Sequence, residues 1–117
     1  MQFCTVVARN YLAQARVLAS SLRALDPNVG VSVLVVDDVD HTVDEANELF
    51  SVVRPAELDI APREFHHMAA SYSVLELATA LKAWLLRLLL ETHEVVCYLD
   101  PDIEVFGSMD PVEVLAK

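Results

Sequence analysis

Glycine is scarce in this sequence of 117 residues, and the phosphate-binding loops that depend on glycine are missing. The only two glycines are Gly30 and Gly107. Neither G-x-G-x-x-G nor G-x-x-x-x-G-K-[ST] occurs, so no glycine-rich loop can cradle phosphates with its backbone amides. A dinucleotide fold with such a loop and a P-loop are therefore excluded.

Basic residues are also few. Eight lysines and arginines stand against eighteen aspartates and glutamates, and the formal net charge is -10. Attraction of a nucleic acid by overall charge is excluded on this ground. An acidic protein that binds a phosphorylated ligand needs local compensation, which a divalent metal ion or a well-placed cationic side chain can supply.

Cysteine is limited to Cys4 and Cys97, and each lies in an apolar stretch typical of a buried strand. We expect both thiols to be reduced core residues rather than a disulfide or a metal-binding pair. The first four residues (MQFC) lack the basic stretch and following apolar run of a signal peptide. The sequence therefore predicts a cytoplasmic protein.

The most apolar stretch, residues 74–90, is interrupted by Glu76, Lys82 and Arg87. Charged residues at these intervals favour a buried helix over a membrane span. Ser73 directly precedes the stretch, and Glu76 lies three residues after Ser73. This spacing predicts a capping box at the start of the helix. Because the stretch is apolar nearly all round, we expect it to be sandwiched between other elements.

The length and the hydrophobic content of 55% suit one compact domain, residues 1–117. Short apolar runs alternate with helical spacings along the chain. Strands are expected at residues 3–8, 31–36, 51–54, 94–99 and 103–106, and helices at residues 11–25, 43–50, 62–70 and 73–91 and from 109 onward. This alternation predicts an α/β fold with a mixed, mostly parallel sheet and helices on both faces.

Polar residues follow three of the expected strands. They are Arg9-Asn10-Tyr11, Asp37-Asp38 and Asp100-Pro101-Asp102. In an open parallel sheet, ligands bind beyond the carboxyl ends of the strands, at the point where the strand order reverses. Two carboxylates two residues apart can hold a hard divalent cation such as Mg2+ or Mn2+, which also bridges phosphate oxygens. These three segments therefore define a candidate site.

Three stretches of the chain resemble the nucleotide-binding half of metal-dependent glycosyltransferases of the A-type fold, most closely the family-8-like bacterial sugar transferases. They read FCTVVARNYLAQARVLASSL, VSVLVVDD and LATALKAWLL…VVCYLDPDIEVFG. The resemblance covers nearly the whole chain and keeps the order of its pieces. It implies a Rossmann-like nucleotide-diphospho-sugar transferase fold, a UDP-sugar donor, transfer to an acceptor hydroxyl, and Mn2+ or Mg2+ as cofactor.

The resemblance also implies roles for individual residues. Asp100 would contact the metal and the sugar or ribose, and Asp102 would be the main metal ligand. Tyr11 would stack on the base, with Ala8 and Asn10 beside it. In the plainer alternative, the two aspartates are turn residues and Tyr11 packs at the start of a helix.

Two further residues have implied roles. Asp38 would approach the ribose or base, and Lys82 would pair with the diphosphate. As alternatives, Asp38 closes a strand and caps the next turn, and Lys82 extends from its helix to solvent. The neighbouring pair His66-His67 lacks a partner at ligand spacing, so we expect a solvated surface pair.

The chain departs from the resemblance after the Asp-Pro-Asp. The acceptor half, with a further metal-binding histidine, is expected to follow, but the sequence stops at Lys117. The resemblance thus implies an incomplete fold, either a fragment or a truncated protein with a possible tendency to self-associate. One alternative function is a catalytically incomplete nucleotide-binding or interaction module. A receiver-like signalling domain fits less well, because the pair Asp37-Asp38 follows the second strand and not the first.

Overall fold

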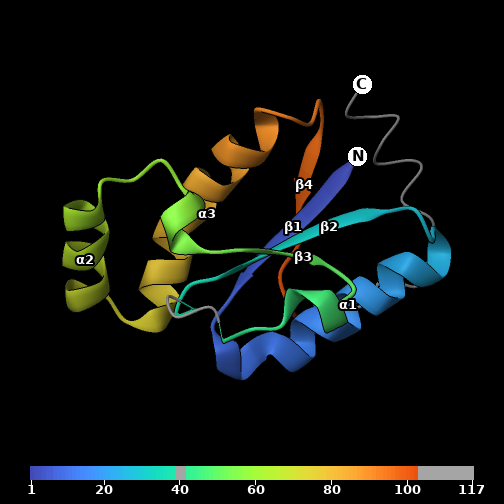
Figure 1. Cartoon of the computed structure of the whole chain (residues 1–117), viewed down its shortest axis with the longest axis horizontal. Coiled ribbons are helices and arrows are strands. Elements are labelled where there is room, and N and C mark those ends of the chain that lie inside the picture. Colours follow the sequence, from blue (N-terminus) through green and yellow to red (C-terminus); the bar gives the residue numbers. More distant parts are fainter. Residues whose placement is uncertain (39–41, 103–117) are drawn as a thin grey trace.

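A computed structural model describes residues 1–38 and 42–102 of the chain. Its four described strands form one sheet in the order β3-β2-β1-β4, and each neighbouring pair is parallel (Figure 1). The strands are β1 (Gln2–Val7), β2 (Gly30–Val35), β3 (Ser51–Val53) and β4 (Val96–Tyr98). The predicted α/β class is confirmed, and these four expected strands are present with ends shifted by one or two residues.

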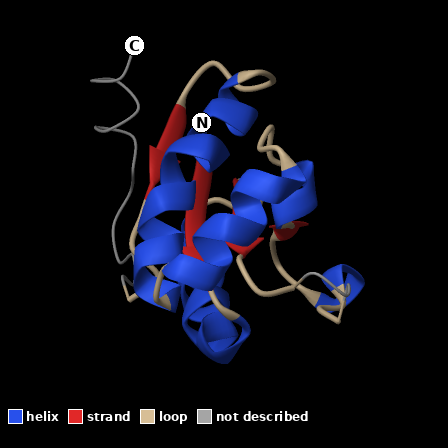
Figure 2. Cartoon of the chain, turned by 90° about the vertical axis from the view of Figure 1, so that its left-hand side faces the viewer, coloured by secondary structure: helices blue, strands red, loops and turns tan. Residues whose placement is uncertain are grey.

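Helices cover both faces of this sheet, as expected from the alternation of elements (Figures 1 and 2). The α-helices are α1 (Leu12–Leu25), α2 (Pro62–Ser71) and α3 (Val74–Leu90), and the short 3-10 turns are η1 (Arg9–Tyr11), η2 (Glu45–Asn47) and η3 (Pro55–Glu57). One apolar core lies between the sheet and α1, and a second lies between the sheet and α3. Among the described residues, none of the helices is long and apolar enough to span a bilayer.

Helix α1 forms because its apolar residues recur at helical spacing. Ala15, Leu18, Ala19 and Leu22 are all buried against the sheet. The helix ends at Asp26, whose carboxylate accepts a hydrogen bond from the backbone N–H of the residue two positions later at 3.0 Å. This Asx-type turn, together with the proline that follows Asp26, stops the helix where the sequence predicts.

Helix α3 begins with the predicted capping box. The Ser73 hydroxyl accepts the Glu76 backbone N–H at 3.2 Å, and a Glu76 carboxylate oxygen accepts the Ser73 N–H at 3.0 Å. The helix buries one stripe of side chains on the sheet: Leu77, Leu81, Leu85 and Leu89. As expected, α3 lies between other elements, the sheet on one side and α2 on part of the other, but the side chains near its two ends, Leu75 and Leu90, are 78% and 53% exposed.

The α-helix predicted over residues 43–50 does not form, so this prediction is wrong. Only the single 3-10 turn η2 forms there. The backbone around it is already engaged by side chains: Asp38 accepts the Val43 N–H, Arg54 donates to the Val43 carbonyl, and Asp44 accepts the Ala46 N–H. These bonds compete with the i to i+4 pattern that an α-helix would need.

The two cysteines are free, as expected. Cys4 lies opposite Tyr98 in the β1–β4 register, and Cys97 lies opposite Phe3. Side chains alternate between the faces of a sheet, so the two thiols point to opposite faces and cannot form a disulfide without a change of register. The expected strand at residues 103–106 and the helix from 109 lie outside the described residues.

Candidate functional site

The strand order places the reversal point of the sheet between β1 and β4. From β1 the chain proceeds outward through β2 and β3 on one side and returns to the other side of β1 as β4. The segments that leave these two neighbouring strands at their carboxyl ends are residues 8–11 and 99–102 (Figure 1). The sheet therefore brings together two of the three polar segments predicted from the sequence, at the position where open parallel sheets bind ligands.

The segment after β1 is a tight turn that exposes two of the predicted side chains. Ala8 is buried, and its carbonyl accepts the Tyr11 backbone N–H at 2.9 Å to close η1. Asn10 and Tyr11 are exposed, and 47% of Tyr11 is accessible. Tyr11 thus presents an aromatic ring to solvent at the reversal point, whereas Ala8 can contribute only backbone groups.

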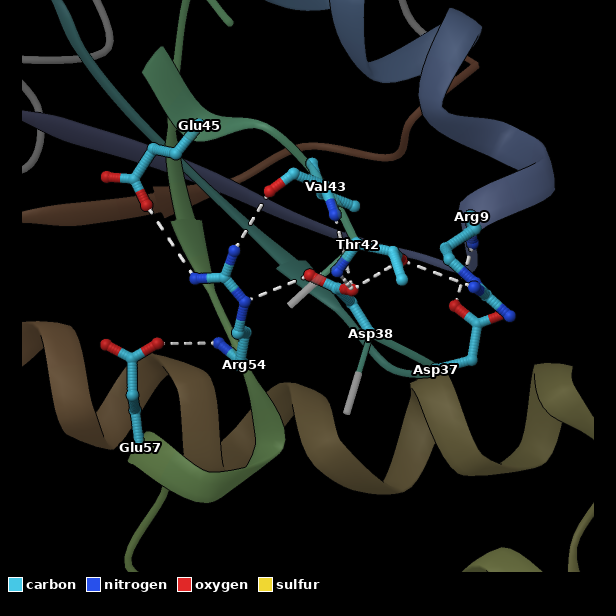
Figure 3. Close-up of polar contacts among 8 residues, drawn as sticks. All are labelled: Arg9, Asp37, Asp38, Thr42, Val43, Glu45, Arg54 and Glu57. Atoms are coloured by element: carbon cyan, nitrogen blue, oxygen red, sulfur yellow. Dashed lines mark hydrogen bonds and ion pairs between the residues drawn. The ribbon is translucent and has the colours of Figure 1, made fainter. Parts of the chain in front are cut away.

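Asp37 holds this turn in place. Its Oδ1 accepts the Arg9 backbone N–H at 2.8 Å, and its Oδ2 lies 3.5 Å from the Arg9 Nε (Figure 3). Arg9 also donates to the Thr42 hydroxyl at 3.3 Å. These bonds tie the end of β1 to the end of β2, so the position of Asn10 and Tyr11 depends on the neighbouring strand.

Asp38 has a different environment from the one expected. Its side chain is fully buried, and both carboxylate oxygens are bonded within the chain (Figure 3). Oδ1 accepts from the Thr42 N–H at 2.7 Å, the Thr42 hydroxyl at 2.8 Å and the Val43 N–H at 3.4 Å, and Oδ2 accepts from Arg54 Nε at 2.9 Å. Asp38 thus caps the turn after β2, as in the alternative in which it has no ligand-binding role. A ligand could reach its carboxylate only if these hydrogen bonds and the ion pair with Arg54 were broken.

The protonation of Asp38 follows from these contacts. Burial by itself would raise the pKa of Asp38, but the hydrogen bonds from Thr42, Arg54 and Val43 outweigh it and lower the pKa below its ordinary value. The group is therefore a carboxylate at neutral pH, and Arg54, itself largely buried, supplies the opposite charge.

Asp100 and Asp102 lie in the turn that directly follows β4, and both are exposed. This turn is anchored to β1, since the Leu99 N–H donates to the Cys4 carbonyl at 3.0 Å. Residues 1–38 and 42–102 contain no group of three or more histidines, cysteines or acids that could hold a metal ion. The two exposed carboxylates still suit Mg2+ or Mn2+, because such ions keep several waters and bind through one or two carboxylates together with substrate phosphates.

Lys82 lies beside this turn on α3. Its Nζ is 4.1 Å from the centroid of the Tyr98 ring, two residues before Asp100. Burial raises the pKa of the Tyr98 hydroxyl, and the negative charge of Asp100 raises it further. The contact between Lys82 and Tyr98, two residues before Asp100, brings the lysine close to the start of this turn.

The predicted surface pair His66-His67 is exposed on α2. The His66 ring packs edge-on against Phe65, with their centroids 6.0 Å apart. Two other residues at the edge of the sheet were not predicted. Arg54 could have been found because it directly follows β3, as Asp37 and Asp38 follow β2, but Tyr98 reads from the sequence as an ordinary strand residue.

Comparison of the chain with models of protein families, with curated proteins and with solved structures found no match. The functional proposal for this chain is therefore based on the residues at the reversal point of the sheet.

Proposed function

We propose that this chain binds a nucleotide diphosphate sugar, most simply a UDP-sugar, as the donor-binding portion of a metal-dependent glycosyltransferase. The observation that best supports the proposal is the placement of the Asp100-Pro101-Asp102 turn beside the turn that carries Asn10 and Tyr11, at the reversal point between β1 and β4. One turn offers two exposed carboxylates and the other an exposed aromatic ring.

The nucleoside end of the donor would lie on the turn after β1. The Tyr11 ring can stack on a base, since every base has an apolar π face that favours aromatic side chains. Asn10 is exposed next to it and carries both donor and acceptor atoms. Ala8 is buried, so its contribution is limited to the backbone.

The diphosphate end would lie at the turn after β4. The protein carries a net charge of -10, so a diphosphate is repelled unless positive charge is added locally. Asp100 and Asp102 would hold Mn2+ or Mg2+. When bound, this ion supplies positive charge to the diphosphate leaving group. Lys82 is a cationic side chain close to this turn, since its Nζ contacts the ring of Tyr98, two residues before Asp100. The reaction served by such a site is transfer of the sugar to an acceptor hydroxyl.

Calorimetric titration of UDP into the purified chain, with and without Mn2+, tests the proposal. We expect binding only in the presence of Mn2+. Asp102→Ala should weaken it by about ten- to a hundredfold, as follows from losing one charge-assisted contact of about 1.5–3 kcal/mol. Asp59→Ala is the matched control, because Asp59 is also exposed but lies after η3, away from β4.

Absence of UDP binding to a folded wild-type sample in Mn2+ would contradict the proposal. A non-catalytic interaction module would then be the better description. Exposed apolar side chains such as Tyr72 and Leu75, 44% and 78% accessible, would serve that function.

A further inference from the structure

Lys82 occupies an unusual position for a lysine. It lies in the middle of α3, next to Leu81, which is fully buried against the sheet, and its own side chain is only partly exposed. A cation that loses part of its hydration needs compensation. The face of the Tyr98 ring, 4.1 Å from Nζ, supplies it through a cation–π contact.

No carboxylate pairs with this cation in the part of the chain that the structure describes. Ion pairs there are formed by Arg9, Arg16 and Arg54, and none involves Lys82. The acidic turn begins at Asp100, which follows Tyr98 by two residues in the chain. Tyr98 therefore links the two, because its ring contacts the cation and the acidic turn follows it in the chain.

The direction of α3 points the cation toward the reversal point. The helix ends shortly before β4 begins. Directly before β4, the Val95 carbonyl accepts a hydrogen bond from the backbone N–H of Gln2, at the amino end of β1. The amino end of α3 is thus at the carboxyl edge of the sheet. Side chains on a helix lean toward its amino end, so the Lys82 chain leans toward the edge where Asp100 lies.

We propose that Tyr98 is a positioning residue, which holds the Lys82 ammonium apart from the Asp100-Pro101-Asp102 turn so that it meets the diphosphate of the donor. The inference rests on the proposed function. A lysine has a long flexible stem, and in a chain of charge -10 a free ammonium would move to a carboxylate. Pairing with Asp100 or Asp102 would occupy a metal ligand and lose the phosphate contact together. The Tyr98 ring keeps Lys82 from pairing with these carboxylates. Because it also holds the lysine side chain in one place beforehand, less conformational entropy is lost when the diphosphate binds.

The Lys82–Tyr98 contact can be tested without any nucleotide. In an NMR spectrum, the Lys82 ε-methylene protons should be shifted upfield by the ring current of Tyr98. Tyr98→Phe should keep the shift, and Tyr98→Leu should abolish it. An unshifted Lys82 resonance in the wild type would overturn the inference, whatever the chain binds.

The consequence for binding is tested by titrating UDP and uridine in Mn2+. Tyr98→Leu should weaken UDP by about three- to tenfold, the range expected for losing a partly desolvated cation–π contact. Uridine affinity, which has no diphosphate contribution, should stay unchanged, and Tyr98→Phe should bind UDP like the wild type. A structural role alone would lower both ligands together.

Lys82→Met shows whether Tyr98 acts through Lys82. In that background, Tyr98→Leu should have no further effect on UDP affinity. Arg87→Met is the matched control, because it removes a cation from the exposed side of the same helix, and it should bind UDP normally.

The outcomes separate the two proposals. If the folded wild type does not bind UDP in Mn2+, the proposed function is contradicted, and Lys82 has no diphosphate for Tyr98 to position it against. A wild type that binds UDP while Tyr98→Leu binds equally well, or while the effect of Tyr98→Leu persists in Lys82→Met, overturns the positioning role and leaves the donor site standing.

Discussion

Arg54 and Asp38 form a buried ion pair that joins the ends of two neighbouring strands. The Arg54 Nε lies 2.9 Å from the Asp38 Oδ2, and the side chains are 14% and 0% exposed (Figure 3). Arg54 also donates to the Val43 carbonyl at 3.1 Å, and Asp38 accepts from Thr42. One charge pair thus ties the chain after β2 to the chain after β3, beside the candidate site.

Removal of the cation should be strongly destabilising. Arg54→Met leaves the Asp38 carboxylate buried without an opposite charge, and breaking a buried pair in this way costs about 3–5 kcal/mol. Urea unfolding monitored by circular dichroism measures the effect. Arg63→Met, on the exposed surface of α2, should change stability by less than about 0.5 kcal/mol. Equal midpoints for Arg54→Met and the wild type would show that the pair adds no stability.

The same pair predicts a dependence of stability on pH. The pKa of Asp38 is lower in the folded chain than its ordinary value of about 3.9. A carboxylate of this kind stabilises the fold at pH values above the unfolded pKa, and the stabilisation is lost as the pH falls through the folded pKa. The difference in stability between the wild type and Asp38→Asn should therefore be constant near neutral pH and shrink below about pH 4. A difference that stays constant down to pH 2 would contradict this linkage.

The capping box of α3 should contribute measurable stability. Ser73→Ala removes the hydroxyl that accepts the Glu76 N–H and should cost about 1 kcal/mol in urea unfolding. Ser73→Asp should restore most of the loss, because aspartate is an equally good N-cap. Ser71→Ala, two residues upstream at the end of α2, serves as the control and should be neutral. If both alanine variants lose the same stability, the cap is not the cause.

Removal of metal should affect ligand binding and leave the fold unchanged. Asp100 and Asp102 are exposed in a turn, and the two apolar cores do not include them. Without UDP, a chelator should leave the thermal midpoint unaltered. With UDP and Mn2+ together the midpoint should rise by mass action, and the chelator should reverse the rise. A chelator-induced fall without UDP would indicate a structural metal instead.

Local signals in the sequence determined most of the secondary structure. Three such signals are the leucine spacing of α3, its Ser73 cap and the Asp26-Pro27 stop of α1. Each involves residues within one or two helical turns of one another, so it can be recognised in the sequence without knowledge of the tertiary contacts. The parallel sheet also follows from the alternation of strands and helices. Asp100 and Asp102 could be expected at the carboxyl edge for the same reason.

Tertiary contacts decided the rest. Asp38 and Arg54 are 16 residues apart in the chain and meet only because β2 and β3 pair, and that meeting buries Asp38. Lys82 and Tyr98 likewise meet only because α3 packs over the sheet beside β4. A side chain's ionic partner depends on which elements are neighbours, and the strand order β3-β2-β1-β4 that makes them neighbours is set by burial of both sheet faces, which no local stretch of the sequence encodes.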